Sequence, residues 1–262
     1  MPTAFQGAIF DVDGVLVDTP HERAWRETLR ELMESGWAGI RHRTTWSPEA
    51  FTPQVYQSLV SGKPRMSGAR AALEHFGVPD ASERTIEYAD RKQGMVVRLI
   101  EAGEFTAYAD ALRFIIAVKD AGLGVAAASS SKNAGLFLRT IRLDTFASEQ
   151  GISSTSVGPG CTLLDIFDAD VSGRDFEHGK PHPEMFLTAA AELGVAPAAA
   201  VVLEDATAGV QAAKAGDMAA IGIARFDDAD LLEAAGADIV VETLDEVDLG
   251  ALAGGKLVKR AS

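Results

Sequence analysis

Short apolar runs that each end in polar residues recur along this chain, and they limit its fold more than any other feature. The first run, Ala8-Ile9-Phe10, is followed directly by Asp11-Val12-Asp13-Gly14. A short buried strand that ends in acidic residues and glycine is typical of an open α/β sheet, in which ligands bind at the carboxyl ends of the strands. The later runs of this kind are Gly124–Ala128, Ala199–Leu203, Ala219–Ala224 and Asp238–Val241.

Helical patterns separate these runs. Gly122, Gly194 and Gly216 follow three of the helical segments, at the position where a helix C-terminus favours glycine. The alternation of strand and helix predicts an α/β fold with a doubly wound parallel sheet. The helical segments are Ala109–Ala121, Asn133–Ile141, Pro183–Leu193 and Ala208–Ala215.

One stretch breaks the alternation, because residues 19–103 contain helical patterns, no clear buried strand and too many residues for a loop. We therefore predict two domains: an α/β core of residues 1–18 and 104–262, and a helical insert of residues 19–103. Gly151–Gly160 is predicted to be a surface loop, and the polar, basic end Gly254–Ser262 is predicted to fray. The helical patterns of the insert are Glu22–Gly36, Ser67–Phe76 and Ser82–Ile100.

Composition excludes several classes of partner. The formal net charge of −14 repels nucleic acids and anionic lipids, so we expect neither a nucleic-acid nor a membrane partner. No apolar run approaches the roughly 18 residues that span a bilayer, and the first residues lack a leader pattern. The single cysteine, Cys161, cannot form an internal disulfide, which favours a cytoplasmic location. We expect a monomer or a weak homodimer.

Asp11 and Asp13 form the strongest chemical signal, since both carboxylates follow the first predicted strand. One of them could attack phosphorus as a nucleophile while the other moves a proton. Gly14 leaves room where the backbone must turn and approach a ligand. An acidic turn with no catalytic role is the plain alternative for this motif alone.

Three further features follow other predicted strands or lie beside them. The Ser129 hydroxyl could donate to a phosphate oxygen, Lys180 could neutralise the same phosphate, and Glu204-Asp205 suit Mg²⁺. Taken singly, these residues are equally a helix cap, a solvated turn lysine and a surface loop. Together, at the ends of successive strands, they predict one site that binds a phosphate and a metal ion.

These motifs resemble the haloacid dehalogenase superfamily of phosphotransferases, and within it the β-phosphoglucomutase-like and sugar-phosphatase branch. The resemblance implies a Rossmann-like core, with residues 19–103 as a helical cap of the type called C1. The motifs that carry it are Phe10-Asp11-Val12-Asp13-Gly14, Ser129-Ser130, Lys180-Pro181 and Glu204-Asp205-Ala206-Thr207-Ala208-Gly209.

The resemblance also implies roles for individual residues. Asp11 would be the phosphorylated nucleophile, and Asp13 the general acid and base, with its backbone carbonyl also on Mg²⁺. Ser129 and Lys180 would hold the transferring phosphate, and Asp205 would bind Mg²⁺ with Glu204 as a further ligand or beside it. The implied metal ligands are thus Asp11, Asp13, Glu204 and Asp205, and the implied substrate-binding residues of the core and the hinge are Gly14, Thr19, Ser130 and Asn133.

The helical insert contains three further candidates for binding the substrate. His21, Arg65 and Lys92 lie in segments that resemble the cap residues of the mutases. Their plain alternatives are a helix-start histidine and solvated charges at helix ends.

The predicted function is Mg²⁺-dependent hydrolysis of a small phosphorylated sugar through an aspartyl phosphate. The alternative is a β-phosphoglucomutase, in which a sugar hydroxyl rather than water accepts the phosphoryl group. A dehalogenase would need neither the second acid Asp13 nor the metal carboxylates, and a binding protein on this scaffold would be expected to lack one of the two aspartates.

Overall fold

A computed structural model describes residues 4–60, 63, 65–225 and 228–260. The chain forms two compact units: a core unit of Met1–Asp18 with Thr106–Ser262, and a cap unit of Thr19–Phe105. In the core unit, strand β2 (Val17–Asp18) pairs antiparallel with β3 (Thr106–Ala107). The chain therefore leaves the core unit and returns to it through two paired strands.

The core unit is built on a six-stranded sheet whose neighbouring strands are all parallel, with the order β5-β4-β1-β6-β7-β8. The order reverses beside β1, because the chain first adds strands on one side of it and then on the other. Such a switch point is where open α/β sheets bind ligands. This confirms the predicted fold class. The strands are β1 (Gly7–Phe10), β4 (Gly124–Ala127), β5 (Ala169–Asp170), β6 (Ala200–Glu204), β7 (Ala219–Ile223) and β8 (Ile239–Val241).

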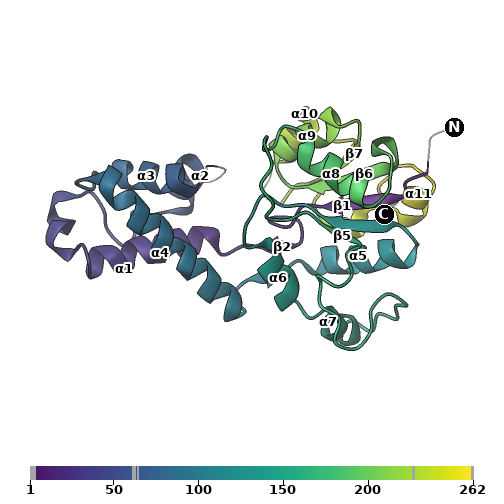
Figure 1. Ribbon diagram of the computed structural model, residues 1–262, viewed down its shortest axis with the longest axis horizontal. Coiled ribbons are helices and arrows are strands. Elements are labelled where there is room, and N and C mark those ends of the chain that lie inside the picture. Colours follow the sequence, from purple (N-terminus) through teal and green to yellow (C-terminus); the bar gives the residue numbers. More distant parts are fainter. Residues whose placement is uncertain (1–3, 61–62, 64, 226–227, 261–262) are drawn as a thin grey trace. The chain divides into compact units, whose positions relative to one another are not determined.

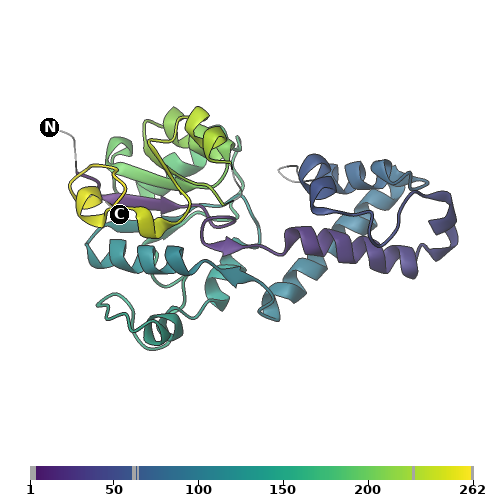
Figure 2. The same cartoon turned by 180° about the vertical axis from the view of Figure 1, so that it is seen from behind.

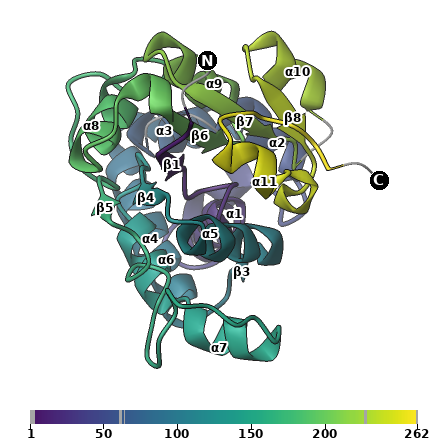
Figure 3. The same ribbon diagram turned by 90° about the vertical axis from the view of Figure 1, so that its right-hand side faces the viewer.

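Helices cover both faces of this sheet (Figure 1). Ile9 packs in one buried cluster with Phe186 and Val210, which belong to helices on one face. The next residue, Phe10, points to the other face, where its ring lies 6.3 Å from the ring of Phe114. The helix that carries Phe114 is α5 (Ala109–Asp120), and the helices on the other face are α8 (Glu184–Glu192), α9 (Thr207–Ala215) and α10 (Ala229–Ala234). Figure 3 shows α5 on the opposite side of the sheet from α8, α9 and α10.

The core unit differs from the sequence prediction in several places. Strand β5 was not predicted, because two residues carry no periodic pattern. The end of the chain does not fray within residues 254–260, because the Asp248 amide donates to the Val258 carbonyl at 2.9 Å and Lys259 bridges to Val247. Residues 261 and 262 lie outside the described part. The remaining elements are α6 (Ala134–Thr140), α7 (Leu143–Glu149), α11 (Leu249–Ala253) and the 3₁₀ turns Pro197–Ala199 and Leu244–Glu246.

The cap unit is helical and has a hydrophobic core of its own. Trp25, Leu29 and Leu32 lie on one face of its first helix and pack with Tyr88, whose hydroxyl donates to the Trp25 carbonyl at 2.9 Å. Figure 2 shows this purple helix beside the blue-green helix of Tyr88. The described elements are α1 (His21–Glu34), a 3₁₀ helix (Ala38–Arg43), α2 (Pro53–Leu59), α3 (Arg65–His75) and α4 (Ala81–Glu101).

The predicted helices of the insert correspond to α1, α3 and α4, whereas α2 and the 3₁₀ helix were not predicted. Residues 61, 62 and 64, which precede Arg65 in the sequence, lie outside the described part. Across the part of the chain that the structure describes, no helix is both long enough and apolar enough to cross a membrane.

Candidate active site

The ends of three neighbouring strands bring the candidate residues of the core together. Phe10, the last residue of β1, pairs with Ala127 on one side and with Leu203 on the other. The ladder continues one step further, where the Asp11 amide donates to the Leu203 carbonyl at 3.1 Å. This register places Asp11, the Ser129 segment and Glu204 at the same edge of the sheet.

Lys180 links two of these strand ends. Its ammonium donates to Asp11 Oδ1 at 2.7 Å and to Glu204 Oε1. It also lies 5.0 Å from the centre of the Phe186 ring. The loop before α8 therefore places the Lys180 ammonium against the carboxylate of the first aspartate.

Glu204 is fully buried and is held from both sides. Its Oε1 accepts from Lys180, and its Oε2 accepts from the Ala206 amide at 2.9 Å. Gly209 makes room for it, because a Cβ there would lie 1.8 Å from Glu204 Oε1. The arrangement orients Lys180 and leaves Glu204 engaged by protein donors.

Asp205 lies against the turn that follows the first strand. Gly14 has a φ of +80°, and a Cβ on it would lie 1.8 Å from Asp205 Oδ2. Glycine is therefore required at position 14 for two reasons: the backbone is left-handed there, and a side chain would overlap Asp205. The backbone of the turn and the Asp205 carboxylate share one small space.

Ser129 faces Asp13. Its buried hydroxyl lies 3.4 Å from Asp13 Oδ2 and accepts from the Ser131 amide at 3.1 Å. The Ser131 hydroxyl accepts in turn from the amide of Asn133, the residue before α6. Ser130 is exposed and Asn133 is buried. Ser131 rather than Ser129 thus contacts the backbone at the start of the helix.

The electrostatics of this site favour a bound cation. Burial and the neighbouring Glu204 carboxylate raise the pKa of Asp205, and burial raises the pKa of Asp11 although Lys180 opposes the shift. Burial alone would lower the pKa of Lys180, but the carboxylates of Asp11 and Glu204 raise it above its ordinary value. The buried carboxylates of Asp11 and Glu204 thus share Lys180, with the half-buried Asp205 next in the chain, and oxygen donors of this kind suit Mg²⁺.

The described residues contain no group of three or more His, Cys, Asp or Glu side chains placed to hold a metal ion. Of the four ligands implied by the sequence, Glu204 already accepts from Lys180 and from the Ala206 amide. The side chains of Asp11 and Asp205 and the Asp13 backbone carbonyl remain, and Mg²⁺ commonly keeps several water ligands. The donor chemistry therefore fits Mg²⁺.

In the cap unit, the structure brings two of the three candidates together. Lys92 Nζ lies 3.4 Å from His21 Nδ1 and 4.9 Å from the centre of the Trp25 ring. Burial and the Lys92 charge lower the pKa of His21 to about 3. Arg65 is exposed and lies 3.7 Å from the Asp90 carboxylate. Thr19 is the first residue of the cap unit.

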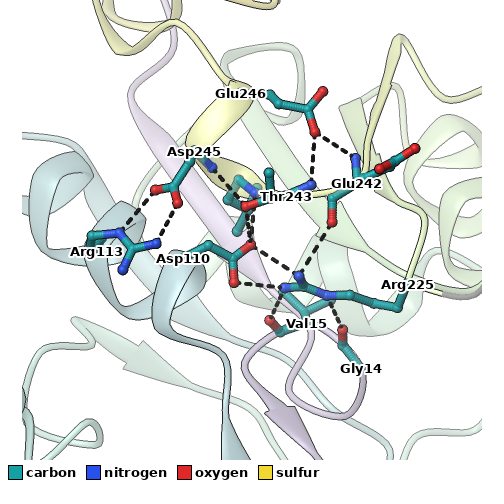
Figure 4. Close-up of polar contacts among 10 residues, drawn as sticks. Gly14, Val15, Asp110, Arg113, Arg225, Glu242, Thr243, Asp245 and Glu246 are labelled. Atoms are coloured by element: carbon teal, nitrogen blue, oxygen red, sulfur yellow. Dashed lines mark hydrogen bonds and ion pairs between the residues drawn. The ribbon is translucent and has the colours of Figure 1, made fainter.

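One contact to the site was missed by sequence reasoning. Arg225 directly follows the predicted strand Ala219–Ala224, and its Nε donates to the Gly14 carbonyl at 3.2 Å (Figure 4). The sequence signal that could have identified Arg225 is its place as a basic residue at the carboxyl end of a predicted strand. Its partner Asp110 lies far away in the sequence and carries no comparable signal.

Comparison with known proteins finds one family and several relatives. Residues 5–217 match the haloacid dehalogenase-like hydrolase family. A β-phosphoglucomutase of Mycobacterium bovis is 34% identical over 263 residues, which cover 94% of this chain and 93% of the relative. A phosphorylated carbohydrates phosphatase of Thermotoga maritima is 28% identical over 210 residues, covering 80% of each chain.

A solved structure extends the likeness to the whole fold. The archaeal β-phosphoglucomutase of Pyrococcus sp. strain ST 04 superposes with a TM-score of 0.68 at 28% identity. The match covers 95% of this chain and 99% of that one. The likeness therefore includes both the core unit and the cap unit.

Proposed function

Because this chain is an enzyme that belongs to the haloacid dehalogenase-like hydrolases, we propose that it transfers the phosphoryl group of a small sugar phosphate through an aspartyl phosphate on Asp11. One observation carries this proposal: the Asp11 carboxylate lies at the switch point of the sheet with the Lys180 ammonium at 2.7 Å. A carboxylate beside a cation suits attack on a phosphate, whose negative charge the cation neutralises.

In the first step, an Asp11 oxygen forms a bond to phosphorus while the bond from phosphorus to the sugar oxygen breaks. Asp13 gives its proton to that leaving oxygen. Lys180 neutralises the charge on the phosphoryl oxygens, and Ser129, which lies 3.4 Å from Asp13, donates to one of them. The products are the free sugar and an aspartyl phosphate.

In the second step, water attacks phosphorus and Asp13 takes the proton that the water loses. The bond from Asp11 to phosphorus breaks, inorganic phosphate leaves, and both aspartates return to their starting states. One general acid thus serves as the base of the return step.

We assign three groups to Mg²⁺: the Asp11 carboxylate, the Asp13 carbonyl and the Asp205 carboxylate. The bound ion would neutralise and align the phosphoryl oxygens. We assign Glu204 to holding Lys180, because both of its oxygens already accept from protein donors. Asp205→Asn should therefore raise the half-saturating Mg²⁺ concentration far more than Glu204→Gln, which should instead lower kcat. Equal Mg²⁺ dependence in the two variants contradicts this division of roles.

A mutase is the second candidate, favoured by the 34% identity over 94% of the chain with a protein named β-phosphoglucomutase. In that reaction a hydroxyl of the bound sugar phosphate takes the place of water. Thr19, His21, Arg65 and Lys92, together with Gly14, Ser130 and Asn133, remain the proposed substrate-binding residues. Whether the enzyme acts as a phosphatase or as a mutase depends on whether water or a hydroxyl of the bound sugar phosphate reaches the aspartyl phosphate first.

A panel of sugar phosphates, with and without Mg²⁺, tests both candidates. It includes β-glucose 1-phosphate with catalytic glucose 1,6-bisphosphate, and it measures free phosphate and glucose 6-phosphate separately. Free phosphate alone identifies a phosphatase, whereas glucose 6-phosphate without free phosphate identifies a mutase. Undiminished turnover in excess chelator would reject the metal site. Sedimentation and fractionation check the predicted monomer or weak homodimer and the cytoplasmic location.

A further inference from the structure

The turn that follows Asp11 is held from outside as well as from within. Inside it, the Gly14 amide donates to the Val17 carbonyl at 2.8 Å, and the Leu16 amide donates to the Val12 carbonyl at 2.9 Å. These bonds leave the carbonyls of residues 14, 15 and 16 for other donors. The turn carries Asp13 and the glycine that lies against Asp205.

Donors from other elements contact those three successive carbonyls. Arg225 Nε donates to the Gly14 carbonyl at 3.2 Å, and its Nη2 donates to the Val15 carbonyl at 3.3 Å. The Tyr108 amide donates to the Leu16 carbonyl at 3.0 Å. Arg225 therefore contacts the backbone of the turn with two nitrogens of one planar group (Figure 4).

Arg225 is itself fixed in place. Its guanidinium forms a two-pronged pair with Asp110, at 3.0 Å and 3.3 Å, and its central carbon lies 3.9 Å from the centre of the Tyr108 ring. Both charged side chains of the pair are only 10% exposed. A planar fork held against a carboxylate and an aromatic ring has little freedom to move.

Asp110 is held on its other side by the segment after β8. Its Oδ2 accepts from the Leu244 amide at 2.8 Å and from the Thr243 hydroxyl at 3.0 Å. Although burial opposes it, these bonds and Arg225 lower the pKa of Asp110, so the carboxylate stays charged. The pair thus connects the turn to α5, β7 and the segment after β8.

We propose that Arg225, held by Asp110, is a positioning residue for phosphoryl transfer, which fixes the Gly14 and Val15 backbone and so keeps Asp13 aligned with Asp205. The inference rests on the proposed function of the Asp11 site. Its physical reason is that a Gly14 Cβ would lie 1.8 Å from Asp205, so the turn and Asp205 have little room for error. A misplacement of about 1 Å in such a site can cost ~10²-fold in rate.

The fold provides a control pair on the same helix, although that pair is more exposed than Arg225 and Asp110. Arg113 and Asp245 also form a two-pronged pair, and they join α5 to the same 3₁₀ turn that follows Thr243 (Figure 4). The contacts of that pair run between α5 and the 3₁₀ turn and not to the turn of residues 12–17. Substitution of Arg113 therefore measures how the loss of a nearby arginine–aspartate pair affects Tm and kcat when the contacts of the turn are unchanged.

The experiment compares Arg225→Met, the double variant Arg225→Met/Asp110→Leu, and Arg113→Met with wild type. The double variant removes both charges of the buried pair, so that neither is left unpaired. We measure Tm, kcat and KM for an aryl phosphate, and hydrogen exchange of the Gly14, Leu16 and Val17 amides in the substrate-free protein.

We expect the double variant to have a higher Tm than Arg225→Met and yet to keep a kcat about 10–100-fold below wild type. Its KM should change less than its kcat, and its amides at the turn should exchange faster. Arg113→Met should match wild type in kcat and in the exchange of those amides.

A double variant with kcat and amide exchange like those of Arg113→Met would overturn the proposal. If the double variant does not fold, Arg225→Lys takes its place, because lysine keeps the charge but cannot contact both carbonyls and the carboxylate as a planar fork. It should lose about tenfold in kcat, and a wild-type kcat would equally overturn the proposal. If the wild-type enzyme transfers no phosphoryl group, the proposed function fails, and the exchange of the amides still decides whether Arg225 positions the turn.

Discussion

Asp11 of the core unit and Arg65 of the cap unit are placed in different ways. In the core unit, Asp11 follows a central strand, and Lys180 reaches it from another part of the chain and is held by a buried glutamate. In the cap unit, Arg65 starts a helix and has an exposed partner at 3.7 Å. A group fixed by several buried contacts can serve chemistry that tolerates little error, whereas an exposed group suits binding that adapts to a substrate.

The units also differ in charge. The cap unit has as many lysines and arginines as aspartates and glutamates, so the whole formal net charge of −14 lies on the core unit. An anionic substrate must therefore approach a strongly negative unit, and local cations such as Lys180 have to overcome this field. All three tryptophans lie in the cap unit, so their fluorescence reports on that unit alone.

The largest expected effect is the loss of turnover when the proposed nucleophile of the core unit is replaced. Asp11→Asn replaces the nucleophile by an amide, and we expect kcat to fall by about 10³-fold or more on aryl phosphates and on sugar phosphates alike. Steady-state kinetics on both substrates measures this loss, with tryptophan fluorescence confirming a folded cap unit. Asp11→Asn with wild-type turnover would show that the nucleophile is another residue.

The second prediction concerns the close approach of Gly14 to Asp205. Gly14→Ala places a methyl group in the space of the carboxylate, so we expect about 10²-fold lower kcat and weaker Mg²⁺ binding. Gly122→Ala is the control, because Gly122 has a φ of +86° but nothing within 4 Å of an added Cβ. It should cost about 1–2 kcal/mol of stability and leave kcat unchanged. Similar kinetics for the two variants would mean that backbone strain alone matters.

The third prediction sharpens the contrast by testing the cap unit. If Arg65 binds a second phosphate of the substrate, Arg65→Lys should lower the ratio of kcat/KM for a sugar bisphosphate over an aryl phosphate about tenfold. Arg70→Lys is the matched control, since Arg70 lies on the same helix in an exposed pair with Glu74 at 2.7 Å. An unchanged ratio in Arg65→Lys identifies Arg65 as a surface charge.

The smallest effect concerns the stability of the cap unit. The pKa of His21 is about 3 in the folded chain, whereas an unfolded histidine takes up a proton near pH 6.5. Since the unfolded state binds more protons, stability is lost as the pH falls from 6.5 towards 3. His21→Gln should therefore lose less stability than wild type between pH 7.5 and pH 5.

Urea unfolding followed by tryptophan fluorescence measures this difference. The exposed His42→Gln in the same unit is the control and should follow wild type. Parallel pH dependence of His21→Gln and wild type would indicate that His21 is not held neutral by burial and by Lys92.

The sequence alone was sufficient to predict the alternating elements, the sheet class and the strand ends on which the acidic residues lie, because periodicity and turn residues are local properties. It also indicated three of the cap helices, whose apolar faces repeat along the helix. It did not predict β5, α2 or the pairing of the end of the chain with residues 246–248, because short elements carry little pattern and gain their stability from the neighbours they meet.

Only the tertiary structure decided which side chains meet. Parallel strands joined by crossovers place Asp11 beside Glu204, although the two are far apart in the sequence, and the loop before α8 then brings Lys180 to both. The same is true of Arg225, Asp110 and the Gly14 carbonyl, whose contact depends on a guanidinium reaching across three separate segments. The local sequence determines which side chains stand at the end of a strand, whereas packing determines which other side chains they contact. The reason is that burial and charge pairing act between segments that are far apart along the chain.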